Sequence, residues 1–185
     1  MDSVKQAQSI VGTGNNREKN DFYPTPSKAT VSLLDNWDFD INQPIWECAC
    51  GDGAISKILI DRGFGVFSTD LYDYGYGVSG IDFLSAKKYA DTIITNPPFK
   101  LAEKFVYRSH EIGVKTLAMF LKLSFLEGQA RKKMFELYPP TIVKVFSKRI
   151  SFGVGNGKGK NNGMIAFAWF IWDSSYLGRP TIGWI

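Results

Sequence analysis

The sequence predicts an α/β protein in which a mostly parallel sheet is covered by helices on both faces. Three observations lead to this prediction. Short apolar runs alternate with helix-length segments along the chain, as βαβ units require. The run Ile45–Cys48 passes through a glycine turn directly into the helical pattern Ala54–Ile60. Several runs also end in polar or acidic residues, which is typical of strands whose carboxyl ends carry a site.

The 185 residues are few enough for one domain and numerous enough to bury a full core. We expect residues 1–20 to form a flexible polar tail and residues 21–185 to form a single domain, with a helix over Ser27–Asn36. The expected strands lie near Ile45–Cys48, Val66–Asp70, Val78–Ile81, Thr92–Thr95, Thr116–Lys122, Ile142–Phe146 and Met164–Trp172. Only a glycine-rich stretch separates the last two, so they are expected to form an antiparallel hairpin. A short tail is expected after them.

The composition excludes several classes of protein. A hydrophobic content of 44% and an aromatic content of 15% argue against a disordered chain. The longest apolar stretch, Met164–Trp172, is much shorter than the roughly 20 residues of a membrane helix. The first 20 residues lack the apolar centre of a signal peptide. We therefore expect a cytoplasmic protein with no membrane partner, and the net charge of +4 is compatible with nucleic acid without requiring it.

A metal site is not expected. Cys48 and Cys50 are two positions apart in an expected strand, so their side chains would point to opposite faces. The one histidine, His110, lies in an expected amphipathic helix at Lys100–Ile112. This set is too small for a zinc site.

The segment Asn96-Pro97-Pro98-Phe99, which follows the apolar run 91–95, is the most informative motif of the chain. Proline fixes its own φ and lacks an N–H group, so two prolines form a stiff corner with carbonyl groups free to accept. Asn96 adds a side-chain oxygen and Phe99 adds an aromatic face. Such a corner suits methylation of an exocyclic amino group on a nucleobase. A plain turn after a strand is the alternative that the motif alone leaves open.

Acidic residues at the ends of three expected strands indicate S-adenosylmethionine as the cofactor. Glu47 opens a Glu-x-x-x-Gly-x-Gly pattern, which is neither a dinucleotide motif nor a phosphate loop, and a carboxylate there suits an ammonium group. Asp70 follows the glycine turn by about 20 positions, where such folds bind ribose hydroxyls. Asp82 beside Phe83 suits an adenine amino group and ring. Taken singly, each is also compatible with a turn, a cap or a solvated acid.

With these motifs in this order, the chain resembles the adenine-specific amino-methyltransferases of DNA, particularly the small members from phages and prophages. The segment Phe22–Pro26 resembles the N-terminal cofactor motif of that family. The resemblance implies a Rossmann-like, S-adenosylmethionine-dependent methyltransferase fold with a seven-stranded sheet. It implies cofactor contacts by Tyr23, Thr25, Glu47, Ala49, Gly51, Asp70, Leu71, Asp82 and Phe83. It also implies catalysis by Asn96, Pro97, Pro98 and Phe99, with Phe99 stacked on a flipped target base.

Basic and aromatic residues of the second half are candidates for nucleic-acid contacts in addition to Phe99. Lys122 ends an expected strand, while Arg149 and Phe152 lie in a segment that resembles the family's region near the target base. Lys158 and Lys160 lie in a glycine-rich loop suited to a phosphate backbone. A core position for Phe152 and a plain hairpin loop are the alternatives.

The expected function is methyl transfer from S-adenosylmethionine to the adenine amino group of DNA. The sequence leaves no room for a separate target-recognition domain, so an accessory specificity subunit or a homodimer is the expected partner. A phenylalanine at the fourth motif position also occurs in RNA guanine-amino methyltransferases. Methylation of RNA or of protein glutamine and an inactive nucleic-acid-binding module therefore stay open. Restriction–modification, defence against restriction and regulation are equally open.

Overall fold

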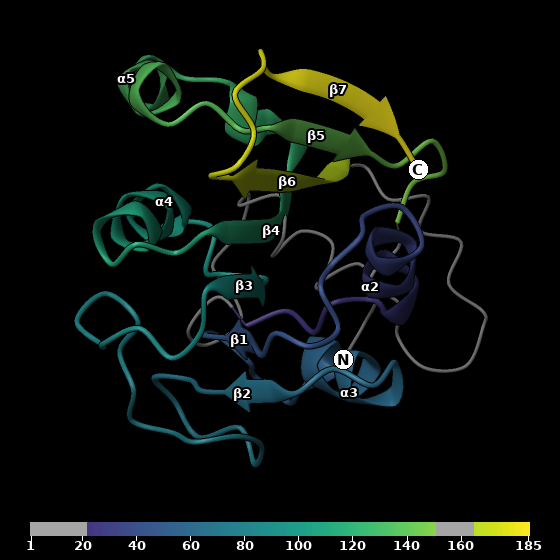
Figure 1. The fold of residues 1–185 in the computed structure, drawn as a ribbon, viewed down its shortest axis with the longest axis vertical. Coiled ribbons are helices and arrows are strands. Elements are labelled where there is room, and N and C mark those ends of the chain that lie inside the picture. The colour runs from purple at the N-terminus through teal and green to yellow at the C-terminus, as the bar shows by residue number, and fades with distance from the viewer. Residues whose placement is uncertain (1–21, 151–164) are drawn as a thin grey trace, which may run out of the picture.

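The structure is a computed structural model that describes residues 22–150 and 165–185 (Figure 1). The expected tail at 1–20 and the candidates Phe152, Lys158 and Lys160 lie outside the described residues. The elements in chain order are α2 (Ser27–Leu34), β1 (Ile45–Glu47), α3 (Ala54–Asp61), β2 (Val66–Ser68), β3 (Thr92–Thr95), α4 (Ala102–Glu111), β4 (Thr116–Lys122), the 3₁₀ turn η2 (Leu123–Leu126), α5 (Gln129–Leu137), β5 (Ile142–Val145), β6 (Phe167–Asp173) and β7 (Thr181–Trp184).

The strands of the described residues form one seven-stranded sheet in the order β2-β1-β3-β4-β6-β5-β7. Neighbours β2, β1, β3 and β4 pair in parallel, and so do β5 and β7. Strand β6 is antiparallel to both β4 and β5. The predicted mostly parallel sheet and the predicted antiparallel pairing of β5 with β6 are thus confirmed.

The identity of the seventh strand was predicted wrongly. The segment Val78–Ile81 forms only an isolated bridge between Thr69 and Val78. Gly75, Gly77 and Gly80 around it have φ angles of +77°, +67° and +78°, which interrupt extended backbone. The seventh strand is instead β7, in the segment that was expected to be a tail. It pairs along one edge with β5 and keeps most of its side chains exposed, so its sequence carries little of the apolar pattern that marks a buried strand.

Within residues 22–150 and 165–185, two helices cover each face of the sheet. In Figure 1, α4 and α5 lie on one side and α2 and α3 on the other. Side chains of strand β4 point alternately to the two faces of the sheet. Met119 packs in the core under α4 and α5, and Phe120 packs in the core under α2 and α3. Trp169 of β6 donates its indole N–H to the carbonyl of Ala29 at 2.8 Å, which ties α2 to the sheet. This burial on both faces explains the continuous apolar runs of the central strands.

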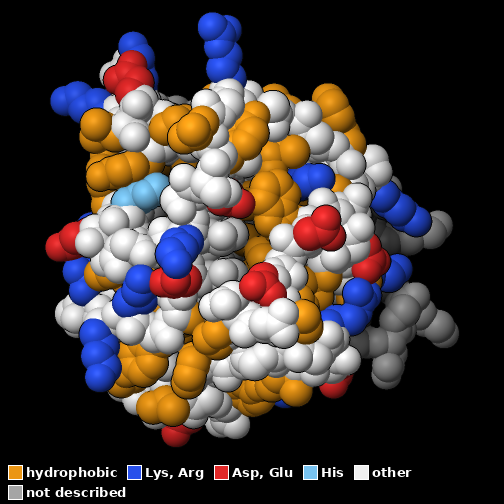
Figure 2. Space-filling model, in the orientation of Figure 1, with side chains coloured by type: hydrophobic (Ala, Val, Ile, Leu, Met, Phe, Trp, Pro, Cys, Tyr) orange, Lys and Arg blue, Asp and Glu red, His pale blue; other side chains and the backbone are white. Residues whose placement is uncertain are grey.

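The described helices and surface bear on two further expectations. None of the helices within 22–150 and 165–185 has the length and apolar content of a membrane span. On the face drawn in Figure 2, lysine and arginine side chains are interspersed with aspartate and glutamate. The net charge of +4 is therefore not gathered into one basic patch on that face.

Candidate functional site

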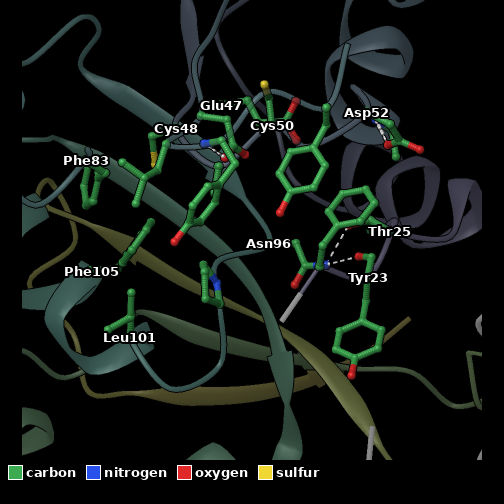
Figure 3. Close-up of a pocket in the computed structure, with 18 of the residues that line it drawn as sticks. Tyr23, Thr25, Glu47, Cys48, Cys50, Asp52, Phe83, Asn96, Leu101 and Phe105 are labelled. Atoms are coloured by element: carbon green, nitrogen blue, oxygen red, sulfur yellow. Dashed lines mark hydrogen bonds between the residues drawn. The ribbon is translucent and has the colours of Figure 1, made fainter. Parts of the chain in front are cut away.

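A cavity of about 410 Å³ opens at the carboxyl ends of β1, β2 and β3 (Figure 3). Its wall is built from the N-terminal segment, the glycine turn after β1, the loop after β2, the corner after β3 and the start of α4. Eight of the nine predicted cofactor residues line it, namely Tyr23, Thr25, Glu47, Ala49, Asp70, Leu71, Asp82 and Phe83. Asn96, Pro98 and Phe99 of the predicted catalytic corner line it too. Tertiary structure thus brings together motifs spread over 77 positions of the chain, from 23 to 99.

The glycine turn is held by the carboxylate of Asp70. Gly51 does not line the cavity itself, but its N–H donates to Oδ2 of Asp70 at 2.9 Å, and the N–H of Tyr72 donates to Oδ1 at 2.9 Å. Asp70 is only 7% exposed. Gly51 has a φ of +53°, and a Cβ atom there would overlap the ring of Phe22. The turn therefore requires glycine on both backbone and packing grounds.

Glu47 is a buried carboxylate at the end of β1. Its side chain is almost fully buried, and Oε2 accepts the backbone N–H of Ser56 at 2.8 Å as well as the Ser56 hydroxyl. Burial raises the pKa of Glu47 to about 8, although the hydrogen bonds from Ser56 act in the opposite direction. The carboxyl group of Glu47 thus titrates close to neutral pH. A cation bound beside it would favour its charged form.

The two cysteines near Glu47 are not equipped for chemistry. Burial raises the pKa of the Cys50 thiol to about 12 and raises the pKa of the Cys48 thiol as well. The thiolates that nucleophilic attack or metal binding would need are therefore disfavoured. Within the part of the chain that the structure describes, no three His, Cys, Asp or Glu side chains are grouped so as to hold a metal ion.

Asn96 is anchored through its amide nitrogen. Nδ2 donates to the backbone carbonyl of Tyr23 at 3.0 Å and to Oγ1 of Thr25 at 3.0 Å, and both bonds are drawn in Figure 3. An asparagine amide has two N–H donors and one carbonyl acceptor. Because both donors are engaged by the N-terminal segment, Oδ1 is the group that Asn96 offers to the cavity that it lines.

The prolines of the corner differ in their surroundings. The Pro98 carbonyl accepts the N–H of Leu101 at 2.8 Å, so it helps to start α4. Pro97 is buried and does not line the cavity. Among the described residues, no backbone N–H donates to its carbonyl. The Pro97 carbonyl thus keeps its capacity to accept a hydrogen bond.

Phe99 is half-buried and has contacts on several sides. The Nζ atom of Lys122 lies 4.8 Å from its ring centroid. The ring of Tyr23 is nearly parallel to it, at 6.3 Å between centroids, and that of Phe167 is 6.0 Å away. Lys122 thus lies next to the corner. Arg149 is exposed and is not among the residues that line the cavity.

The structure adds aromatic wall residues that the sequence analysis did not name individually, although Phe22 belongs to its N-terminal cofactor motif. Phe22 and Tyr74 stack with their centroids 4.3 Å apart, which joins the N-terminal segment to the loop after β2. The ring centroids of Phe105 in α4 and Phe83 are 4.5 Å apart, and the two rings form an apolar wall. The sequence does carry a sign of the aromatic loop after β2, because Tyr72, Tyr74 and Tyr76 recur at every second position beside glycines. No signal marked Phe105, which reads as an ordinary apolar position of an amphipathic helix.

Comparison with known proteins gives similarity of fold. No family model matches the chain, and no curated protein matches it in sequence. A provisionally named RNA methyltransferase from Pyrococcus horikoshii has a TM-score of 0.61 at 14% identity, over 93% of this chain and 98% of that one. A provisionally named class I S-adenosylmethionine-dependent methyltransferase from Listeria monocytogenes has a TM-score of 0.61 at 10% identity, over 97% and 71%.

A third similar structure is the modification subunit of a provisionally named type I restriction enzyme from Vibrio vulnificus. It has a TM-score of 0.58 at 13% identity, over 97% of this chain and 50% of that one. The chain thus spans about half the length of that subunit. At these identities the likenesses show the fold alone, which is the Rossmann-like fold of the class I methyltransferases, as the resemblance implied.

Proposed function

We propose that the protein transfers a methyl group from S-adenosylmethionine to the exocyclic amino group of adenine in DNA. The observation that carries this proposal is the anchored amide of Asn96, whose Nδ2 is held at 3.0 Å by two acceptors of the N-terminal segment. An oxygen acceptor is thereby presented next to an aromatic ring in a cavity of ligand size. The fold supports the choice of cofactor, and so do the carboxylates of Glu47, Asp70 and Asp82 that line the cavity.

The residues present fit S-adenosylmethionine. A cavity of about 410 Å³ lies within the common range for ligand pockets, roughly 300–1,000 Å³. The buried carboxylate of Glu47 suits the ammonium group. The carboxylate of Asp70 accepts two backbone N–H groups and, with about four lone-pair sites in all, has capacity left for ribose hydroxyls. Phe83 and Phe105 provide an apolar wall for a purine.

When bound, the cofactor supplies an electrophilic methyl group on a sulfonium. The chain's own contribution is to hold the acceptor nitrogen. The proposed acceptors of the two amino hydrogens are Oδ1 of Asn96, which lines the cavity, and the carbonyl of the adjacent Pro97, which does not line it but keeps its capacity to accept. Two acceptors would favour a pyramidal nitrogen with an available lone pair. That nitrogen would take the methyl group as the C–S bond of the bound cofactor breaks, and the proton that it then carries would leave to solvent. The rate gain comes from positioning and from carbonyl dipoles that face the developing positive charge.

The aromatic face of Phe99 is the proposed stacking site for a flipped adenine. Lys122 lies over this ring in the present structure at 4.8 Å. When a base stacks on the ring of Phe99, the ammonium group of Lys122 would move to a phosphate of the bound nucleic acid, where a lysine acts as a point charge. Arg149, which lies outside the cavity, remains a proposed contact to the nucleic acid. Phe152, Lys158 and Lys160 remain proposed contacts as well.

Methylation of RNA is a second candidate for the same corner. DNA is favoured by the likeness to the Vibrio modification subunit, of which this chain covers 50%. RNA is favoured by the likeness to the Pyrococcus protein, of which the chain covers 98%. If DNA is the substrate, we propose that a specificity subunit or a second copy of the chain supplies recognition of the target sequence.

The test is transfer of isotope-labelled methyl groups onto single-stranded DNA, duplex DNA, RNA and a protein fraction, followed by mass spectrometry of the nucleosides. We expect labelled N6-methyladenine from DNA. The variant Asn96→Ala is expected to lose turnover while it keeps its affinity for the cofactor, as measured by calorimetry. Label in RNA or protein alone would overturn the choice of substrate. Full turnover by Asn96→Ala would overturn the catalytic assignment.

A further inference from the structure

We infer that Thr25 is a positioning residue, which fixes the orientation of the catalytic amide rather than serving only as a cofactor contact. This inference rests on the proposed function. Its basis is the pair of hydrogen bonds that Nδ2 of Asn96 donates to the Tyr23 carbonyl and to the Thr25 hydroxyl, each at 3.0 Å. These bonds join positions 73 and 71 residues apart in the chain.

The two acceptors select one of the two orientations of the amide. The Tyr23 carbonyl can only accept, so an amide turned by 180° would place Oδ1 against a carbonyl oxygen with no proton between them. The Thr25 hydroxyl engages the second N–H of the correct orientation. Thr25 is only 6% exposed, so water is poorly placed to replace it. Without this hydroxyl, one amide N–H would be left unpaired and the amide would turn more freely.

The same short segment holds the other end of the corner. The ring of Tyr23 lies nearly parallel to that of Phe99, with an interplanar angle of 12° and 6.3 Å between centroids. Tyr23 therefore contacts the proposed amine acceptor through its backbone and the proposed stacking face through its ring. The segment Phe22–Thr25 thus sets the relative position of Asn96 and Phe99, on which in-line transfer depends.

The hydrogen bonds also act on the chemistry of Asn96. Donation by an amide nitrogen polarises the amide, which increases the negative charge on its oxygen, and chains of hydrogen bonds strengthen one another in a buried site. Oδ1 of Asn96 is therefore a stronger acceptor with Thr25 in place than without it. The consequence is an effect on turnover, whereas a residue that only binds cofactor would act on affinity.

The test uses Thr25→Val, which replaces the hydroxyl by a methyl group of similar size. We expect kcat to fall roughly 10- to 100-fold, as a misplaced catalytic group does, while the dissociation constant of S-adenosylmethionine changes little. Thr25→Ser keeps the hydroxyl and is expected to restore most of kcat. The matched control is Thr30→Val, since Thr30 is buried and its hydroxyl has no hydrogen-bond partner among the described residues.

Two outcomes of these assays would overturn the inference. Thr25→Val with unchanged kcat and weakened cofactor binding would make Thr25 a cofactor contact alone. Equal losses of kcat in the Thr25 and Thr30 variants, or no rescue by serine, would show a structural effect of valine.

A second measurement does not depend on activity. In nuclear magnetic resonance of protein labelled with ¹⁵N, the Asn96 side-chain signals are assigned as those lost in Asn96→Ala. Thr25→Val should shift one of the two amide protons and speed its exchange with solvent, whereas Thr25→Ser should not. Unchanged signals in Thr25→Val would contradict the inference even if the enzyme methylates adenine. A shifted signal in a protein that methylates no adenine would instead contradict the proposed function.

Discussion

The carboxylate of Glu47 at the end of β1 accepts two hydrogen bonds from Ser56 in the first turn of α3. The bond from the backbone N–H is 2.8 Å long. An acid at the start of a helix is favoured by the helix dipole, yet burial raises the pKa of Glu47 to about 8. Desolvation therefore outweighs the hydrogen bonds, and this balance makes Glu47 sensitive to pH and to bound charge.

The first prediction concerns stability and pH. The pKa of Glu47 is about 8 in the folded protein and near its ordinary value of 4.5 when unfolded, so the folded state binds more protons between these limits. Its contribution to the free energy of unfolding is thus fully present below about pH 4.5 and is lost as the pH rises through 8, by at most about 1.4 kcal/mol per pH unit. Urea unfolding from pH 5 to 8 measures this slope. Glu47→Gln should flatten it, and an identical slope in that variant would refute the assignment.

The second prediction concerns protons released on binding. A cationic ligand beside Glu47 lowers the pKa of its carboxyl group, so binding of S-adenosylmethionine at pH 7 should release up to one proton. Calorimetry in buffers with different heats of ionisation counts these protons. We expect affinity to rise with pH up to about 8. The release should vanish in Glu47→Gln, and a release that persists there would assign it to another group.

The third prediction concerns Asp70. Asp70→Ala removes the acceptor for the Gly51 and Tyr72 N–H groups and the proposed acceptor for ribose hydroxyls. Cofactor binding should weaken by about 1.5–3 kcal/mol, as expected for a charged hydrogen bond. Calorimetry measures the affinity, and thermal unfolding measures the cost of the loosened turn. A loss of Tm with normal affinity would leave Asp70 a structural role alone.

The fourth prediction concerns the contact between Gly51 and Phe22. Gly51→Ala places a methyl group into the ring of Phe22 and also strains a φ of +53°. Each single variant should lower Tm. In the double variant Gly51→Ala/Phe22→Ala the overlap is relieved and only the backbone strain remains, at about 1–2 kcal/mol. The two effects should therefore not add, and strict additivity would exclude the contact.

The fifth prediction concerns Lys122 above Phe99. Lys122→Met should raise the KM for nucleic acid with little change in kcat and should reduce the salt dependence of binding by about one phosphate contact. Lys57→Met is the matched control, because Lys57 lies 5.0 Å from the ring of Tyr76 at the glycine turn. Binding titrations at several salt concentrations distinguish the two. Equal effects of both variants would refute a specific role for Lys122.

Local pattern predicted most of the sheet and the order of the motifs. The strands at Thr92–Thr95 and Thr116–Lys122 were found at the predicted residues, because both are buried on both faces and leave continuous apolar runs. The strand predicted at Val78–Ile81 is absent, because a single bridge and three left-handed glycines replace it. Strand β7 escaped prediction because it depends on β5 for its hydrogen bonds and not on burial of its own side chains.

The site shows the same division. The sequence by itself determined that Glu47, Asp70 and Asn96 lie at strand ends, because each follows or ends a short apolar run. The carboxyl ends of parallel strands meet at one edge of a sheet, so these residues belong to one site. Only the tertiary structure decided which way the Asn96 amide faces and that the pKa of Glu47 is raised. The physical reason is that both depend on contacts and burial contributed by distant segments, and a local pattern of residue types carries no information on either.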